Sequence, residues 1–163
     1  MIEKLGCPKK QSDFLSGGGL MNINSLERFL EAQEHKYDIA LKEIRAGKKR
    51  THWMWYIFPQ LRGLGRSQMA YTYGVNGIEE ARKYLAHPIL STRLLEITEA
   101  LLEHKDKPAY KILGDIDDMK LQSCMTLFSI ISENNSVFHQ ALNCFFDGEQ
   151  DLNTLDLIKK GVV

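Results

Sequence analysis

The segment from residue 48 to residue 67, KKRTHWMWYIFPQLRGLGRS, constrains the fold more than any other part of the chain. It contains both tryptophans, Trp53 and Trp55, together with Tyr56 and Phe58. A buried aromatic side chain covers roughly 150–250 Å² of surface, so leaving several of them in water is unfavourable. We therefore expect this segment to lie in the core, beside a pocket, or both.

The apolar residues that precede this segment have helical spacing. From Asn24 to Ile44 they recur at intervals of three and four, which is typical of a helix with one buried face. Asn24 and Glu27 have the spacing of a capping box, and Gly47 is a typical residue after the end of a helix. These signals predict a first helix over residues 24–46.

Similar signals predict the other helices. Ser67 and Ser136 are typical N-caps, Asn76 and Glu79 repeat the spacing of a capping box, and Pro88 suits a first helical turn. Residues 51–58 are expected to form either a short helix, capped by Thr51, or a strand. We favour the helix because no partner strand is evident. The sequence thus predicts an all-α domain of seven or eight helices without a substantial sheet. Six further helices are expected over residues 68–73, 76–86, from 88 to about 102, 115–132, 136–148 and 153–160, besides a short helical segment that ends at Gly114.

Length and composition fit one globular domain. The chain has 163 residues, of which 44% are hydrophobic and 26% are charged. A chain of this length and composition can bury enough apolar surface to fold without disulfides. Residues 1–21 contain three consecutive glycines and predict a flexible leader, or a leader that packs Phe14 and Leu15 on the domain. Residues 22–163 form the expected domain.

Charge and cysteine content exclude several classes of function. The chain has 21 Lys and Arg and 21 Asp and Glu, hence a formal net charge of zero, so no overall field attracts nucleic acid or a membrane. Its three cysteines form no CxxC pair, and its histidines are dispersed, so we expect neither a metal nor a cofactor. It has neither an apolar run of membrane-spanning length nor a secretory signal, which predicts a cytoplasmic location.

Four strings in the sequence carry a family resemblance: LERFLEAQ at 26–33, HWMWYIFPQLRGLGRS at 52–67, EARKYLAHPIL at 80–90 and DIDDMKLQSCMTLF at 115–128. In this order they resemble the small family catalogued as domain of unknown function 1810, which includes a mycobacterial hypothetical protein. The resemblance spans about residues 22–143. It implies a mainly α-helical single domain with a site near the aromatic segment, but no reaction. The calpastatin-like label of this family implies nothing here, because calpastatin-type inhibitors are disordered.

The aromatic segment carries the residue types of a pocket for an anion or a nucleotide-like molecule. Trp53 or Trp55 can stack on a planar ring, and Arg62 or Arg66 can bind a phosphate or carboxylate. The glycines and the serine that follow can present backbone N–H groups. The alternative is that the tryptophans are core residues and the glycines only turn the chain. Candidate ligand-binding residues here are Trp53, Trp55, Gln60, Arg62, Gly63, Gly65 and Ser67.

Two candidate proton-transfer residues and a polar strip complete the predicted site. His52 can act as an acid or base near neutral pH, although a histidine of this kind is more often a packing residue. Asp117 can act in the same role or simply begin a helix. Lys120, Ser123 and Thr126 lie three residues apart on one face of that helix and form this polar strip. Lys120 and Ser123 can line the same pocket, or be a solvated lysine and a small packing residue.

The sequence leaves two functions open. The first is binding or turnover of a phosphorylated or nucleotide-like small molecule by the residues named above. The second is a non-catalytic module that docks a protein partner through the aromatic segment. A concave pocket with converging polar residues favours the first function, whereas internal rings or a flat apolar patch favour the second.

Overall fold

The computed structural model describes residue 22 and residues 24–161, and the predicted leader, residues 1–21, lies outside this range. The described part contains ten α-helices and no sheet, so the all-α prediction is confirmed while the predicted number of helices was too low. The helices are α1 (Glu27–Gln33), α2 (Tyr37–Arg45), α3 (Met54–Ile57), α4 (Gln68–Thr72), α5 (Gly77–Ala86), α6 (Pro88–Leu102), α7 (Ala109–Leu113), α8 (Asp117–Ile130), α9 (Val137–Phe146) and α10 (Leu152–Lys160).

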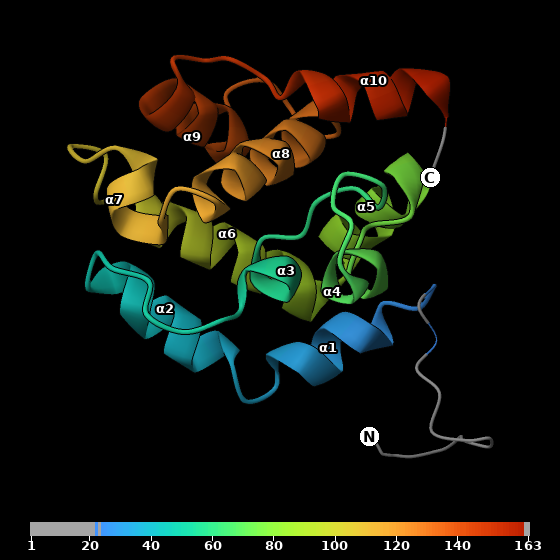
Figure 1. Ribbon diagram of the computed structural model, residues 1–163, viewed down its shortest axis with the longest axis horizontal. Coiled ribbons are helices and arrows are strands. Elements are labelled where there is room, and N and C mark those ends of the chain that lie inside the picture. Colours follow the sequence, from blue (N-terminus) through green and yellow to red (C-terminus); the bar gives the residue numbers. More distant parts are fainter. Residues whose placement is uncertain (1–21, 23, 162–163) are drawn as a thin grey trace.

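The helices are arranged around α8 and α6 (Figure 1). Helix α8 packs against α5, α7, α9 and α10, while α6 packs against α2, α5 and α9. The sequence predicts α8 to be apolar on more than one face, and its run from Ser123 to Ser129 is buried throughout. No helix within residues 24–161 has the length and apolar composition needed to cross a lipid bilayer.

A chain of aromatic contacts joins four helices through the core. Ring centroids are 5.2 Å apart for Phe29 and Tyr84, 5.4 Å for Tyr84 and Phe128, and 5.7 Å for Phe128 and Phe138. All four rings are buried. Tilted and edge-on pairs of this kind are favourable beyond the area that they bury, so this chain of rings ties α1, α5, α8 and α9 together.

The first predicted helix, residues 24–46, is two helices. Helix α1 begins three residues later than predicted, and residues 34–36 separate it from α2. The break allows the two helices to pack on different partners, α1 against α3 and α2 against α6. Gln33 at the end of α1 is buried and donates hydrogen bonds to the Tyr56 carbonyl at 2.8 Å and the Tyr84 hydroxyl at 3.1 Å. These tertiary contacts favour ending the helix there.

Several predicted helix ends are confirmed. Ser67 Oγ accepts from the Ala70 N–H at 3.0 Å, and Ser136 Oγ accepts from the His139 N–H at 3.4 Å. Pro88 occupies the first turn of α6, and Gly114 follows α7 with a φ of +98°. A residue without a side chain fits this left-handed conformation best.

Other predicted caps were wrong. Helix α3 covers only Met54–Ile57 and has no side-chain cap, because the Thr51 hydroxyl donates to Glu43 at 2.8 Å instead. The Asn76 side chain does not cap α5, and its backbone N–H donates to Glu80 at 2.8 Å. Helix α10 is capped by Asp151, two residues before the predicted start.

Candidate functional site

Trp53 is a core residue. Its side chain is fully buried, and its indole N–H donates to Glu43 Oε1 at 2.8 Å. Glu43 also accepts from the backbone N–H groups of Arg50 and Thr51 at 2.8 and 3.1 Å. Burial alone would raise the pKa of Glu43, but these hydrogen bonds lower it to about 2. Glu43 therefore fixes both the indole and the chain that leads to it.

Trp55 lies in α3, two residues after Trp53, and is half-buried. The ammonium of Lys120 lies 4.5 Å from the centroid of its ring, within cation–π range. Lys120 is also 3.2 Å from Asp117, which forms a second ion pair with Lys49 at 2.9 Å. The Lys49 ammonium is in turn 5.1 Å from the centroid of the Trp53 ring. One carboxylate thus joins two lysine–tryptophan pairs.

An open hollow lies beside Lys120, and we call it the Lys120 hollow. Its volume is about 210 Å³. A narrow cleft continues from it, shares Gln60 and Lys120 with it, and reaches Trp55 and Tyr73. Three elements enclose the hollow: the loop that provides Gln60, Leu64 and Gly65, the first turns of α8 with Ile116, Met119, Lys120 and Ser123, and the start of α10 with Asp151 and Asn153.

The loop that forms one wall of this hollow is held by a close approach of two segments. The Arg62 N–H donates to the Val75 carbonyl at 2.9 Å, and the Val75 N–H donates to the Gln60 carbonyl at 2.8 Å. Gly74 makes this approach feasible, because its Cα lies directly against the backbone of Arg62. The loop is thus positioned by backbone contacts as well as by its side chains.

Replacing Gly74 with alanine should lower the free energy of unfolding by about 1–3 kcal/mol. The added Cβ would lie 2.5 Å from the Arg62 Cα and 2.7 Å from the Ala70 carbonyl oxygen, and neither atom can move without disturbing the loop. Urea unfolding measures this change. A Gly74→Ala protein with the wild-type unfolding midpoint would contradict the close approach.

The structure brings together some of the predicted site residues. Gln60, Gly65, Lys120 and Ser123 line the Lys120 hollow, and Trp55 lines the adjoining cleft. Asp117 lies outside the lining but contacts Lys120. Because Asp117 already pairs with two ammonium groups, it is better suited to positioning Lys120 than to accepting a proton from a ligand.

The other predicted residues lie elsewhere. Arg62 donates to the Tyr71 carbonyl at 3.0 Å and to Asn24 at 3.2 Å, and its guanidinium lies 4.9 Å from the centroid of the Tyr71 ring. Ser67 caps α4, and Gly63 faces Leu157. His52 is exposed and, like Trp53, is absent from the lining of both the hollow and the cleft.

Comparison with known proteins identifies the family. A family model described as "Protein of unknown function (DUF1810)" matches residues 23–158. The chain belongs to the DUF1810 family. The solved structure of the conserved hypothetical protein Rv1873 from Mycobacterium tuberculosis is similar, with a TM-score of 0.81 and 41% sequence identity over 85% of this chain and 99% of that chain. No curated protein matches the chain. The family resemblance seen in the sequence is thus confirmed.

Sequence reasoning missed several residues of the hollow in this DUF1810 protein. Ile116 and Met119 line it, yet these residues are 72% and 67% exposed. The start of α10 reaches the hollow because the Asp151 N–H donates to the Thr126 hydroxyl of α8 at 2.8 Å. Thr126 belongs to the polar strip of α8 that the sequence singled out, so the strip was a usable signal for this contact.

Arg28 is a second feature that sequence reasoning missed, and it holds the loop that carries Gly74 in place. Its guanidinium is buried and forms a two-pronged ion pair with Glu80 at 2.9 and 3.0 Å. Its remaining donors meet the carbonyls of Thr72 at 2.7 Å, Gly74 at 2.8 Å and Ser25 at 2.6 Å. All five N–H groups are therefore used, and the loop that carries Gly74 is tied to α1 and α5.

Proposed function

We propose that this DUF1810 protein binds a small molecule with an anionic group in the Lys120 hollow. A phosphorylated or nucleotide-like molecule is the ligand class that fits best. The observation that carries the proposal is the position of the Lys120 ammonium, which lies at the junction of the hollow and the cleft and touches both Trp55 and Asp117.

Local charge supports an anionic ligand. Lys49, Lys120 and the Asp117 that pairs with both form a group with one net positive charge. The Asp151 carboxylate, which also lines the hollow, caps α10 by accepting from the Thr154 N–H and hydroxyl at 2.8 and 2.6 Å. An ammonium group has three donors, so Lys120 can hold Asp117 and still donate to a phosphate or carboxylate.

The shape of the site supports a ligand with a ring attached to that anion. A volume of about 210 Å³ is below the range of roughly 300–1,000 Å³ that is common for drug-sized ligands. The hollow alone therefore suits a small anionic group. If Lys120 turns from Trp55 to this group, the cleft opens and the uncovered indole face can stack on the ring. Gln60 and Ser123 can then hydrogen-bond the polar part of the ligand.

A second candidate function rests on the apolar rim. Ile116 and Met119 are largely exposed at the edge of the hollow, and Leu152 at the start of α10 is 77% exposed. Exposed apolar side chains grouped in this way are typical of surfaces that contact other proteins. In this alternative the aromatic segment supports a protein-docking surface, and the hollow receives a side chain of the partner.

The test is to titrate nucleotides and sugar phosphates into the wild-type protein and a Lys120→Gln variant. We expect at least one compound to raise the melting temperature of the wild type, and its Kd to increase about tenfold in the variant because a charged hydrogen bond is lost. Isothermal titration calorimetry measures the Kd. Lys83→Gln on α5 is the matched control, because Lys83 is an exposed lysine remote from the lining of the hollow.

Tryptophan emission provides a second measurement. A ligand that draws Lys120 away from Trp55 should change the emission of the wild type, and this change should disappear in Trp55→Phe, which keeps Trp53. The proposal fails if no compound alters the melting curve, or if Lys120→Gln binds as tightly as Lys83→Gln. Binding of a protein partner that is lost in Met119→Ser but retained in Lys120→Gln would favour the docking alternative.

A further inference from the structure

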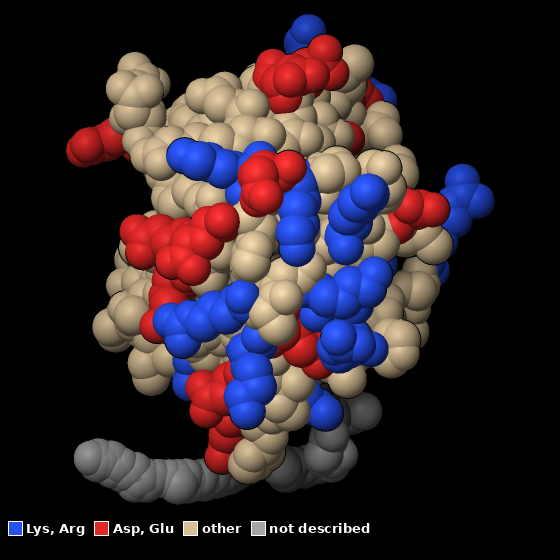
Figure 2. Space-filling model, turned by 90° about the vertical axis from the view of Figure 1, so that its left-hand side faces the viewer, with Lys and Arg blue, Asp and Glu red and all other residues tan. Residues whose placement is uncertain are grey.

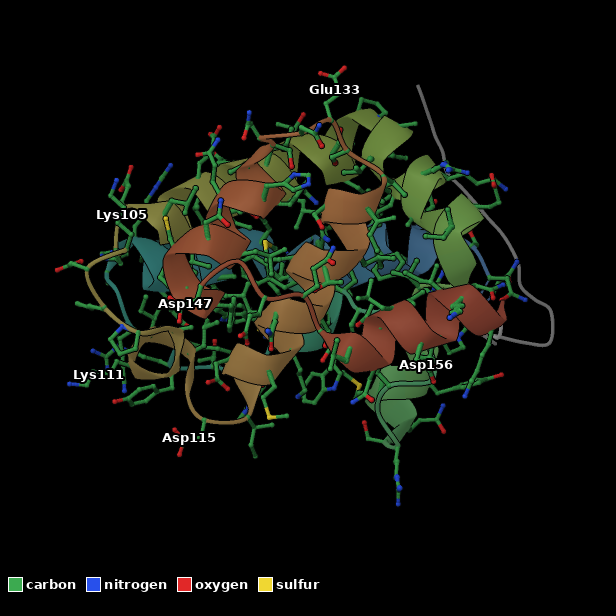
Figure 3. All side chains as sticks on the ribbon, turned by 90° about the horizontal axis from the view of Figure 1, so that it is seen from above. Lys105, Lys111, Asp115, Glu133, Asp147 and Asp156 are labelled. Carbon is green, nitrogen blue, oxygen red and sulfur yellow. The ribbon has the colours of Figure 1, made fainter. Side chains whose placement is uncertain are left out.

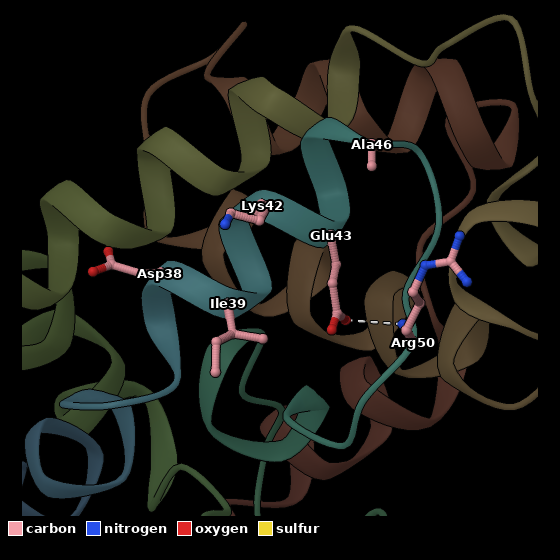
Figure 4. A pocket seen from close by; sticks show the side chains of 6 residues that line it. All are labelled: Asp38, Ile39, Lys42, Glu43, Ala46 and Arg50. Carbon is pink, nitrogen blue, oxygen red and sulfur yellow. Dashed lines mark hydrogen bonds between the residues drawn. The ribbon is translucent and has the colours of Figure 1, made fainter.

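A larger hollow lies on the opposite side of the aromatic segment, and we call it the α2 hollow. Its volume is about 400 Å³, and it lies between the outer face of α2 and the chain that follows that helix. Figure 4 shows Glu43 between Ile39 and Lys42 on one side and Arg50 on the other, with the Arg50 guanidinium pointing away from Glu43. Ile39 is 42% exposed, so this hollow offers an apolar surface to solvent.

Two acidic and two basic side chains line the α2 hollow, and the contacts of Glu43 differ from those of the two cations. Glu43 accepts four hydrogen bonds, from the Arg50 and Thr51 N–H groups, the Thr51 hydroxyl and the Trp53 indole. These four donors stabilise the ionised carboxylate, so the hydrogen-bonding capacity of Glu43 is taken up by the protein itself. Lys42 and Arg50 are exposed and form no ion pair within the part of the chain that the structure describes. An incoming negative group therefore meets two cations with available donors.

The positive charge continues beyond this hollow. The Lys49 N–H donates to the Ile112 carbonyl at 2.7 Å, which places residues 48–50 along α7. The Lys107 ammonium lies against Gly47, where an added Cβ would be 2.9 Å from Nζ. Lys and Arg side chains gather over the middle of this face (Figure 2), and Lys105 and Lys111 project from the same end of the molecule (Figure 3).

We propose that the α2 hollow and this basic face dock an acidic peptide segment of a partner protein. One apolar side chain of the segment would fill the hollow over Ile39 and Ala46, and its carboxylates would meet Lys42, Arg50 and the lysines beyond. Charge complementarity selects and orients such a partner, while a buried apolar anchor supplies much of the affinity.

A peptide fits this surface better than a nucleic acid. Among the residues that the structure describes, no aromatic one lines the α2 hollow, whereas proteins that bind single strands usually stack bases on aromatic side chains. Acidic residues also interrupt the basic face: Asp38 lines the hollow, and Asp106 stands between Lys105 and Lys107. A peptide can place neutral residues opposite these carboxylates, but a phosphate backbone carries a charge at every step.

Fluorescence anisotropy with a labelled peptide of glutamates around one central leucine tests this inference. We expect the wild type to bind the peptide, and the double variant Lys42→Gln, Arg50→Gln to bind it about tenfold more weakly. The matched control is Lys83→Gln with Lys159→Gln, which removes the same charge from exposed positions on α5 and α10. Ile39→Ser should also weaken binding about tenfold, whereas Ile89→Ser, which changes a comparably exposed isoleucine on α6, should not.

The outcomes separate the alternatives. The inference is overturned if the wild type does not bind the peptide, or if both charge-removing double variants weaken binding equally, because attraction is then unspecific. If binding survives Ile39→Ser, or survives replacement of the peptide leucine by serine, the inference that an apolar side chain of the peptide fills the hollow is wrong. Tighter binding of an oligothymidine than of the peptide, lost in the Lys42 and Arg50 variant, would assign the face to nucleic acid. None of these results depends on Lys120, so they do not bear on the small-molecule proposal.

Discussion

Replacing Arg28 with alanine is expected to lower the free energy of unfolding by about 3–5 kcal/mol, because one partner of a buried ion pair is removed and the other remains. Glu80 is buried, and its carboxylate would lose the two hydrogen bonds that it now accepts from the guanidinium. The carbonyls of Thr72 and Gly74 would lose their donor as well. Chemical denaturation at neutral pH measures the change.

Lysine should not substitute for Arg28. Its ammonium has three donors on a flexible stem, whereas the guanidinium uses five donors in a fixed plane to reach α5 and three carbonyls. The matched control is Arg82→Ala, which breaks an exposed ion pair with Glu79 at 2.9 Å. Exposed pairs contribute at most about 1 kcal/mol, so the control should be nearly neutral. Equal losses for Arg28→Ala and Arg82→Ala would contradict the role assigned to Arg28.

The same ion pair predicts a loss of stability in acid. Burial alone would raise the pKa of Glu80, but the hydrogen bonds from Arg28 and from the Asn76 N–H lower it below its ordinary value of 4.5. A carboxyl group whose pKa is lowered by folding stabilises the protein fully above its unfolded pKa. This contribution is lost as the pH falls through the lowered pKa. The free energy of unfolding of the wild type should therefore decrease below about pH 4.5. The part of this decrease that comes from Glu80 should be absent in Glu80→Gln.

Arg28 also shows what the sequence could and could not predict about the fold. Caps such as Ser67 and Ser136 depend on a few neighbouring residues, and the sequence placed them correctly. The break at residues 34–36 has no glycine or proline to signal it, and Tyr37 continues the apolar stripe beyond it. The break is stabilised by contacts of Gln33 with residues 23 and 51 positions away. The position of Arg28 likewise depends on its contact with the distant Glu80. A single sequence does not show which distant residues come into contact.

The candidate site could be predicted only in part, because its geometry too depends on contacts that the sequence does not show. Trp53 and Trp55 are two positions apart, so on a helix they lie on nearly opposite sides. One of them must face the core if the other faces the hollow, but the sequence does not say which. The structure places Trp53 inside and Trp55 beside Lys120. Arg62 takes part in the strand-like contact through its backbone N–H, which donates to Val75, while its side chain donates to the Tyr71 carbonyl.

This division of the two tryptophans leads to the second large expected effect. Trp53→Ala should lower the free energy of unfolding by about 3–5 kcal/mol, because it empties a fully buried site. It also removes the indole donor of Glu43 and the ring that faces Lys49. Trp55→Ala should cost about half as much, since its ring is only half-buried. Denaturation curves of both variants, measured side by side, give the two changes.

Trp53→Phe separates the packing of the indole from its hydrogen bond. Phenylalanine fills most of the site but cannot donate to Glu43, which keeps its three other hydrogen bonds. We expect a loss of about 1–2 kcal/mol for this variant, well short of the loss for alanine. Ligand binding should be retained in Trp53→Phe and weakened in Trp55→Ala, because only Trp55 borders the cleft. The reverse pattern, with Trp53→Phe fully stable but unable to bind and Trp55→Ala unfolded, would show that the two rings have exchanged roles.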